Sequence, residues 1–157
     1  MRILVLALGN DILGDDAVGL LVADKLERLL PEELRSRVDI VKSSQAGFYL
    51  LDYFLMGHDR VIVVDSIIGP ESGKIVEIDP DSLKPASAPS PHYSGLPEIF
   101  SLLEKLGSPI PDVEIYAITI NEPHIGADIS EPVKEASEKL ANMLILRLRE
   151  LLLDSHE

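Results

Sequence analysis

Apolar, β-branched runs alternate with amphipathic stretches along the first half of the chain, and this order constrains the fold more than any other feature. The runs MRILVLAL (1–8), RVDIVKSS (37–44) and RVIVVDS (60–66) have the length and composition of strands. Residues 16–30 show helical periodicity, and a short apolar segment near 47–56 separates the second and third runs. This βαβαβ order predicts a mostly parallel sheet with helices on both faces.

The second half of the chain extends the same sheet. Residues 73–79 (GKIVEID) follow the third run too closely for a crossover helix, so they predict an antiparallel or edge strand. After a proline-rich loop at 84–91, we expect a helix at about 93–106 and a central strand at 112–120 (DVEIYAITI). Ser130, Glu131 and Pro132 form the start of a last helix. Its apolar stripe comprises Val133, Ala136, Leu140, Leu144, Leu148 and Leu151. The predicted fold is an α/β three-layer αβα sandwich around a mixed, twisted sheet.

Size and composition narrow the class of protein. The 157 residues, 46% of them hydrophobic, predict one domain over residues 1–153, followed by a frayed tail at 154–157. No run approaches the roughly 18 apolar residues of a membrane span, and Met1 and Arg2 lead straight into a strand, so we expect a cytoplasmic protein without membrane contact. The net charge of −13 opposes nucleic acid and favours cations or basic peptide segments. Because the chain has no cysteine, carboxylates and imidazoles must hold any metal.

Three aspartates follow the first strand, in GNDILGDDAVG (9–19), where many nucleotide-binding folds place a glycine-rich phosphate cradle. Either Asp15 or Asp16 is expected to cap the helix that begins near Ala17, because a carboxylate accepts hydrogen bonds from the free N–H groups there. Asp15 and Asp16 cannot easily both occupy this single capping position. A second carboxylate therefore remains to face the crevice at the carboxyl ends of the strands.

Two further side chains are expected at the same edge of the sheet. Asp65 ends the run VIVVDS, and His92 follows a proline in SPHYSGL. His124 in EPHIG also follows a proline, and it could serve either the site or the anchoring of the last helix. His58 and His156 are expected to be incidental. Two carboxylates and an imidazole from separate elements match the ligands of a borderline divalent metal such as nickel, zinc or iron.

The ordered set GNDILGDDAVG, VIVVDS, SPHYSGL and EPHIG resembles the [NiFe]-hydrogenase maturation endopeptidases over nearly the whole chain. The resemblance implies an endopeptidase that removes the C-terminal extension of a [NiFe]-hydrogenase large-subunit precursor after nickel insertion. It implies that Asp16, Asp65 and His92 converge on nickel, with Asp16 and Asp65 as the catalytic carboxylates. The nickel would arrive with the substrate, so no resident catalytic metal is expected. Either the metal or a carboxylate could activate the attacking water.

The chain departs from the family pattern at two places. Residues 42–47 (KSSQAG) keep only the final Ala-Gly of a segment that in many relatives begins with an aspartate, two glycines and a threonine. That segment is implicated in substrate recognition, so the departure leaves open a different hydrogenase class or a different precursor sequence. Asp16 stands where some relatives have glutamate, which shortens the side chain by one methylene and keeps the oxygen ligand.

Two other classes of protein use comparable residues. A receiver-like phosphoacceptor domain binds magnesium with acidic residues after its first and third strands, although no lysine follows the 112–120 strand here. A non-catalytic nickel-binding chaperone would need the same ligands without turnover. Magnesium favours all-oxygen ligands, so a requirement for His92 would favour nickel over the receiver-like alternative.

Overall fold

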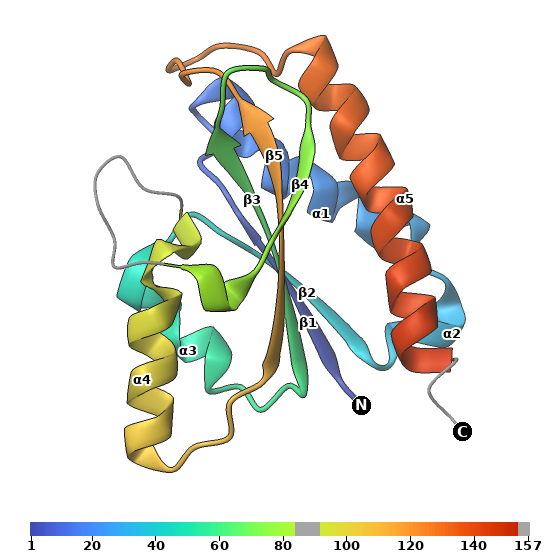
Figure 1. Ribbon diagram of the computed structural model, residues 1–157. Helices are drawn as coiled ribbons and strands as arrows, with labels where there is room; N and C mark the ends of the chain where they lie inside the picture. The colour runs from blue at the N-terminus through green and yellow to red at the C-terminus, as the bar shows by residue number, and fades with distance from the viewer. Residues whose placement is uncertain (84–91, 154–157) are drawn as a thin grey trace.

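A computed structural model describes residues 1–83 and 92–153, which form a mixed five-stranded sheet between two layers of helices (Figure 1). The strands are β1 (Ile3–Leu8), β2 (Val38–Ser43), β3 (Arg60–Ile68), β4 (Ile75–Ile78) and β5 (Asp112–Ile120). Their order is β2-β1-β3-β5-β4, with β4 antiparallel to β5 and all other neighbours parallel. The parallel sheet, the interior position of β5 and the antiparallel edge strand confirm the predicted α/β fold.

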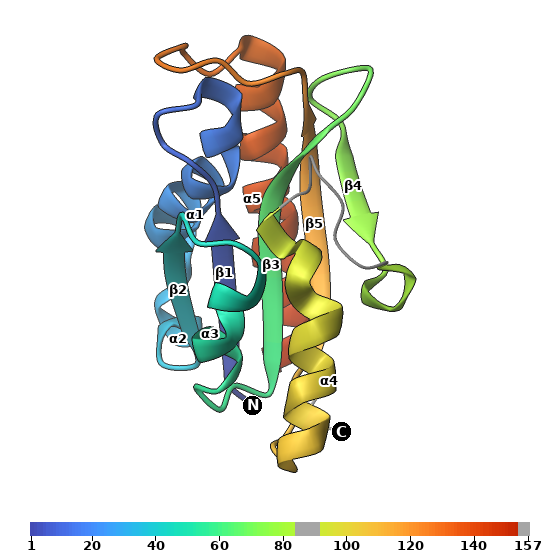
Figure 2. The same cartoon turned by 90° about the vertical axis from the view of Figure 1, so that its left-hand side faces the viewer.

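The helices divide between the two faces of the sheet (Figures 1 and 2). One face packs against α1 (Val18–Leu29), α2 (Glu32–Arg35) and α5 (Glu131–Leu153), and the other against α3 (Leu51–Phe54) and α4 (Leu96–Leu106). Short 3-10 turns complete the chain: η1 (Gly14–Ala17), η2 (Gly47–Leu50), η3 (Pro80–Ser82) and η4 (His92–Gly95). The segment near 47–56 thus forms η2 and the single turn α3, and α2 was not predicted.

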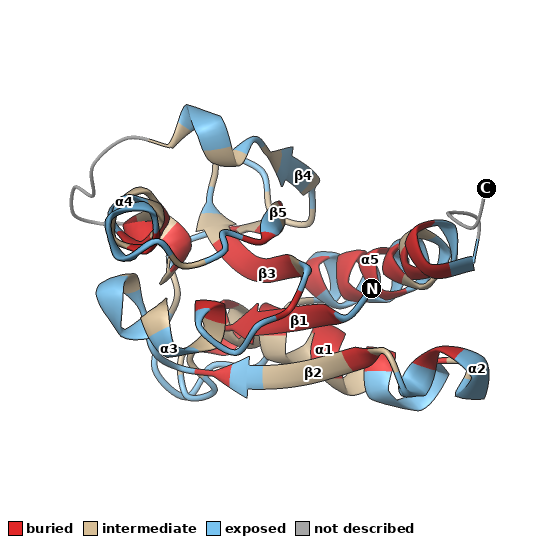
Figure 3. Cartoon of the chain, turned by 90° about the horizontal axis from the view of Figure 1, so that it is seen from below, coloured by how far each residue is buried: buried red, intermediate tan, exposed pale blue. Residues whose placement is uncertain are grey.

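Each helix layer has its own apolar core. Ile3 and Val5 of β1 face α1 and α5, whereas Leu4 and Leu6 face α3 and α4. All six residues of β1 are buried because the strand is covered on both sides, as Figure 3 shows for the central strands. The predicted apolar stripe of α5 is buried at every position.

Close packing of α1 against the sheet depends on Gly19. A Cβ atom at this position would lie 2.3 Å from the carbonyl oxygen of Leu8 and 2.9 Å from that of Val64. Both distances are far below van der Waals contact, so only glycine lets the helix start this close to the ends of β1 and β3. The aspartate loop before α1 is thereby held at the carboxyl edge of the sheet.

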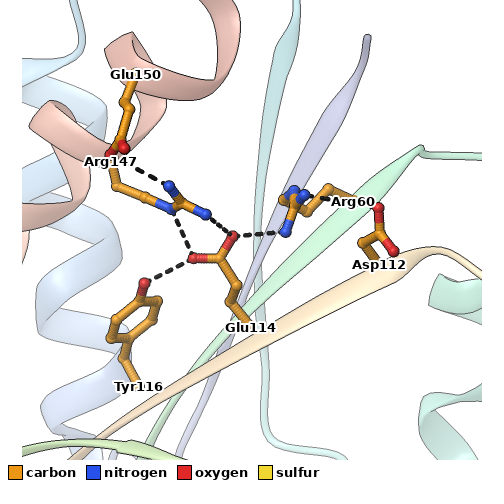
Figure 4. Close-up of polar contacts among 6 residues, drawn as sticks. All are labelled: Arg60, Asp112, Glu114, Tyr116, Arg147 and Glu150. Atoms are coloured by element: carbon orange, nitrogen blue, oxygen red, sulfur yellow. Dashed lines mark hydrogen bonds and ion pairs between the residues drawn. The ribbon is translucent and has the colours of Figure 1, made fainter. Parts of the chain in front are cut away.

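A buried carboxylate braces α5 at the amino ends of the strands (Figure 4). Glu114 accepts hydrogen bonds from Arg147 Nε and Nη2 at 2.9 and 3.0 Å, from Arg60 at 2.8 Å and from the Tyr116 hydroxyl at 2.7 Å. Burial by itself would raise the pKa of Glu114, but these donors and the two cationic charges outweigh burial and lower it. The network lies at the opposite end of the sheet from the aspartate loop.

The structure corrects one predicted boundary and leaves two segments undescribed. β3 continues past residue 66 to Ile68, because the nine-residue β5 pairs with it as far as Ile68 and Ile120. The proline-rich loop at 84–91 and the tail at 154–157 lie outside the described residues. Among the described helices, none is both long and apolar enough to cross a membrane.

Candidate metal site

Asp65 occupies a fully buried position inside β3, directly after Val64, the last apolar residue of its run. The prediction that it ends the strand is wrong, because β3 pairs with β5 for three further residues. The prediction that it lies beside the end of β1 is correct, since the last pair between these strands joins Ala7 with Val64. The side chain is 0% exposed. Beyond Val64, β1 no longer lies beside β3. Side chains on opposite faces of β3 are therefore not separated by a neighbouring strand on that side, and they can approach one another.

Asp16 reaches this place from the 3-10 turn η1. The turn begins at Gly14, whose φ of +57° is unfavourable for residues with a Cβ. The Asp16 side chain is largely buried, and its Oδ1 accepts a hydrogen bond of 2.6 Å from the Ser66 hydroxyl. Consecutive residues of a strand point to opposite faces, so Ser66 faces the α1 side and Asp65 the α4 side.

Asp15 points away from the crevice and binds the start of α5. Its two carboxylate oxygens accept hydrogen bonds from the Ser130 backbone N–H at 2.7 Å and from the Ser130 hydroxyl at 2.9 Å. The N-cap positions of η1 and α1 are Leu13 and Ala17, and neither makes a side-chain capping hydrogen bond, so the prediction that one of the two aspartates caps the helix is wrong. The reason is that α1 continues directly from η1, whose residues occupy the capping positions.

His92 begins η4 and is held by Asp65 through two contacts. The His92 backbone N–H donates to Asp65 Oδ2 at 2.9 Å, and His92 Nδ1 lies 3.1 Å from Asp65 Oδ1. An ionised carboxylate only accepts hydrogen bonds, so this contact favours the tautomer with the proton on Nδ1. In the neutral ring, the lone pair is then on Nε2, which lies 4.0 Å from Asp16 Oδ2.

The three side chains together form a compact ligand set. One ligand atom from each of Asp16, Asp65 and His92 can be chosen so that all lie within 4.8 Å of one another. Two ligands of one ion at bonds of about 2.1 Å lie no more than about 4.2 Å apart, so small side-chain adjustments would let all three bind a single cation. Imidazole with carboxylate suits a borderline divalent metal.

The charged groups of this site shift one another's pKa values. Burial raises the pKa of Asp65, and the nearby Asp16 charge adds to this effect, while hydrogen bonds from His92 and Ser66 oppose it. The hydrogen bond to Asp65 raises the pKa of His92 against the opposing effect of burial. Two carboxylates this close repel each other unless a positive charge lies between them. A cation at this position would therefore relieve their repulsion.

Neither His58 nor His124 joins this group. His124 is exposed in the loop after β5. His58 is buried at the opposite end of the sheet, where its Nε2 lies 2.7 Å from Asp39 Oδ2. His156 lies outside the described residues. The sequence analysis missed Ser66, which contacts both carboxylates: its hydroxyl binds Asp16, and its backbone N–H donates to Asp65 Oδ1 at 2.8 Å.

Comparison with known proteins identifies the family. The profile of the HycI hydrogenase maturation proteases matches residues 20–147, which is most of the chain. The chain belongs to the hydrogenase maturation protease family. The matched region includes Asp65 and His92 and begins just after Asp16.

Individual relatives of the family agree with this assignment. The hydrogenase 2 maturation protease of Escherichia coli is 30% identical over 96% of this chain and 92% of its own. The structure of the E. coli hydrogenase maturating endopeptidase HybD matches with a TM-score of 0.79 at 27% identity, covering 97% of this chain and 94% of that one. A [NiFe] hydrogenase maturation protease HycI from Thermococcus kodakarensis gives 0.73 at 26% identity, covering 94% and 92%. Family membership removes the support for a receiver-like domain.

Proposed function

We propose that this maturation protease removes the C-terminal extension of a [NiFe]-hydrogenase large-subunit precursor after nickel has been inserted, and that it acts in the cytoplasm. The observation that carries the proposal is the convergence of Asp16, Asp65 and His92 within 4.8 Å at the carboxyl edge of the sheet. The nickel is part of the substrate in this proposal. Cleavage would then depend on nickel, because a precursor without nickel brings no metal ion for Asp16, Asp65 and His92 to bind.

The contacts suggest different tasks for the two carboxylates. The two oxygens of Asp65 together accept three hydrogen bonds, one from Ser66 and two from His92. Asp65 therefore orients the imidazole, and it offers a remaining lone pair to the substrate nickel. Asp16 uses Oδ1 for the Ser66 hydroxyl, which leaves Oδ2 directed toward His92 Nε2. Asp16 Oδ2 and His92 Nε2 are therefore the atoms best placed to meet the nickel.

Asp16 is also the better placed base. A water molecule that attacks the scissile carbonyl must lose a proton. Oδ2 of Asp16 accepts no hydrogen bond in the described structure, so one of its lone pairs can bind the nickel while the other takes the proton. The proton would pass from the water to Asp16 and then to the amine that leaves when the peptide C–N bond breaks. The substrate nickel would polarise the carbonyl or lower the pKa of the water.

The test compares precursor with and without nickel. We expect the wild-type protein to shorten only the nickel-loaded precursor, as measured by intact mass. Asp16→Asn, Asp65→Asn and His92→Ala should each stop the shortening while retaining the wild-type circular dichroism spectrum. His124→Ala is the matched control, since this histidine is exposed at the same edge, and it should cleave normally.

Two results would count against the proposal in different ways. Unchanged cleavage by all three site variants would remove the residue assignment. Tight binding of the nickel-loaded precursor with no shortening would instead support the alternative of a non-catalytic nickel-binding chaperone.

A further inference from the structure

Four large apolar side chains are exposed on the loops around the candidate site. They are Ile12 (57% exposed), Phe48 (52%), Tyr49 (76%) and Ile125 (80%), and we call them the apolar rim. Each belongs to a loop or turn that follows a parallel strand, namely β1, β2 or β5. Single exposed apolar residues are common, but exposed apolar side chains on three separate loops beside one site indicate a surface for a partner.

Backbone contacts join this rim to the site on both sides. Ile12 lies four residues before Asp16, and its carbonyl oxygen accepts a hydrogen bond of 2.8 Å from the N–H of Gly126, so the loops after β1 and β5 meet. On the other side, η2 packs against η4, the turn that carries the site histidine. A Cβ atom on Gly95 of η4 would lie 2.6 Å from the Cα of Gly47 in η2. Phe48 and Tyr49 follow directly in that turn.

The same loops lack lysine and arginine, and their exposed carboxylates lie in the loops after β1 and β5. The loops after β1, β2 and β5 and the turn η4 contain no lysine or arginine over residues 9–17, 44–50, 121–130 and 92–95. Besides the site itself, they present three exposed carboxylates, those of Asp11, Glu122 and Asp128. The whole chain carries a net charge of −13. A segment docking here therefore meets apolar side chains interspersed with negative charge.

We propose that the apolar rim docks an extended segment of a partner protein in which apolar side chains alternate with lysine or arginine. Apolar side chains of the segment would cover the rim, and its cations would neutralise the three carboxylates. A second copy of this chain would bring the same carboxylates against each other, and an anionic membrane would be repelled. That the partner is the hydrogenase precursor rests on the proposed function, and the segment would then lead its scissile bond to the site.

The first experiment tests the rim with the precursor. The double variant Ile12→Ser with Ile125→Ser keeps the Ile12 carbonyl contact and removes two apolar side chains. We expect its KM for the nickel-loaded precursor to rise about tenfold while kcat stays unchanged. Leu146→Ser is the matched control, because this α5 side chain is also exposed, at 68%, and lies outside these loops. An unchanged KM in the double variant would overturn the docking proposal and leave the proposed function intact.

The second experiment does not depend on cleavage. Binding of three synthetic peptides is followed by NMR of the backbone amides: one alternates leucine with lysine, one leucine with glutamate and one serine with lysine. The leucine–lysine peptide should bind about tenfold more tightly than either other peptide and shift the amides of Ile12, Phe48 and Ile125. Equal binding of the three peptides would overturn the proposal. If the protein prefers the leucine–lysine peptide but does not cleave the nickel-loaded precursor, the docking proposal stands and the proposed function is wrong.

Self-association gives a further outcome. If the wild-type protein dimerises in analytical ultracentrifugation and the double variant does not, the rim is an interface between two copies, and the proposed occupant is wrong.

Discussion

Replacing Ser66 with alanine should loosen the candidate site and weaken the fold together. The Ser66 hydroxyl donates a hydrogen bond of 2.6 Å to Asp16 Oδ1, and the two residues are only 4% and 9% exposed. A buried hydrogen bond to a charged group contributes about 2 kcal/mol, so the unfolding equilibrium should shift by about thirtyfold toward the unfolded state. Asp16 also loses the contact that holds Oδ1 away from His92. A misplaced ligand should lower kcat/KM for the nickel-loaded precursor by about tenfold.

Urea denaturation and precursor cleavage measure the two effects separately. Ser66→Thr retains a hydroxyl and suits a strand, so it should restore most of both quantities. Ser137→Ala is the matched control, because the buried Ser137 hydroxyl donates to the Lys134 carbonyl within α5 and touches no site residue. It should leave cleavage unchanged.

The reasoning would be refuted if Ser66→Ala unfolded within about 0.5 kcal/mol of the wild-type protein and cleaved at the wild-type rate. A loss of stability with unchanged kcat/KM would show that Ser66 supports the fold without positioning Asp16.

Three further predictions concern other parts of the structure. Asp15→Asn should cost about 1 kcal/mol in urea denaturation through its lost contacts to α5 yet preserve cleavage, whereas Asp16→Asn should abolish cleavage; equal loss in both would contradict their separate roles. Gly19→Ala should destabilise the protein by more than about 2 kcal/mol in the same assay, because its Cβ would overlap two carbonyl oxygens; wild-type stability would show that α1 can shift. The pKa of Glu114 is lower in the folded protein, so its stabilisation is present above the unfolded value of 4.5 and is lost as pH falls through the folded pKa. Stability measured against pH should therefore fall more steeply in acid for the wild-type protein than for Glu114→Gln, and parallel curves would contradict the assigned pKa.

The sheet could be predicted from the sequence because buried strand and helix faces consist of apolar residues. β1 is apolar at every position since both of its faces are covered, and the α5 stripe repeats with the helical period since one side of that helix is covered. The carboxyl edge could be predicted for the same reason, because the ends of parallel strands meet at one edge. The convergence of Asp16, Asp65 and His92 followed from this rule and from the family resemblance.

The details of the site depended on contacts between residues far apart in the chain. Asp15 and Asp16 are equivalent in any local pattern. They differ because Asp15 accepts a hydrogen bond from Ser130, which lies 115 residues away in the chain. Ser66 looked like an ordinary strand residue, since nothing near it in the sequence shows that Asp16 will face its hydroxyl. The length of β3 was set by its partner β5.

The order of apolar and polar residues by itself determined the layers, the strand directions and the edge at which polar side chains collect, because these follow from the periodicity of buried faces. Only the tertiary structure decided which oxygen of each carboxylate is engaged, which nitrogen of His92 is free, and which apolar side chains stay uncovered beside them. Hydrogen-bond partners and solvent exposure are properties of atoms brought together in space, and a local pattern of residue types does not encode them.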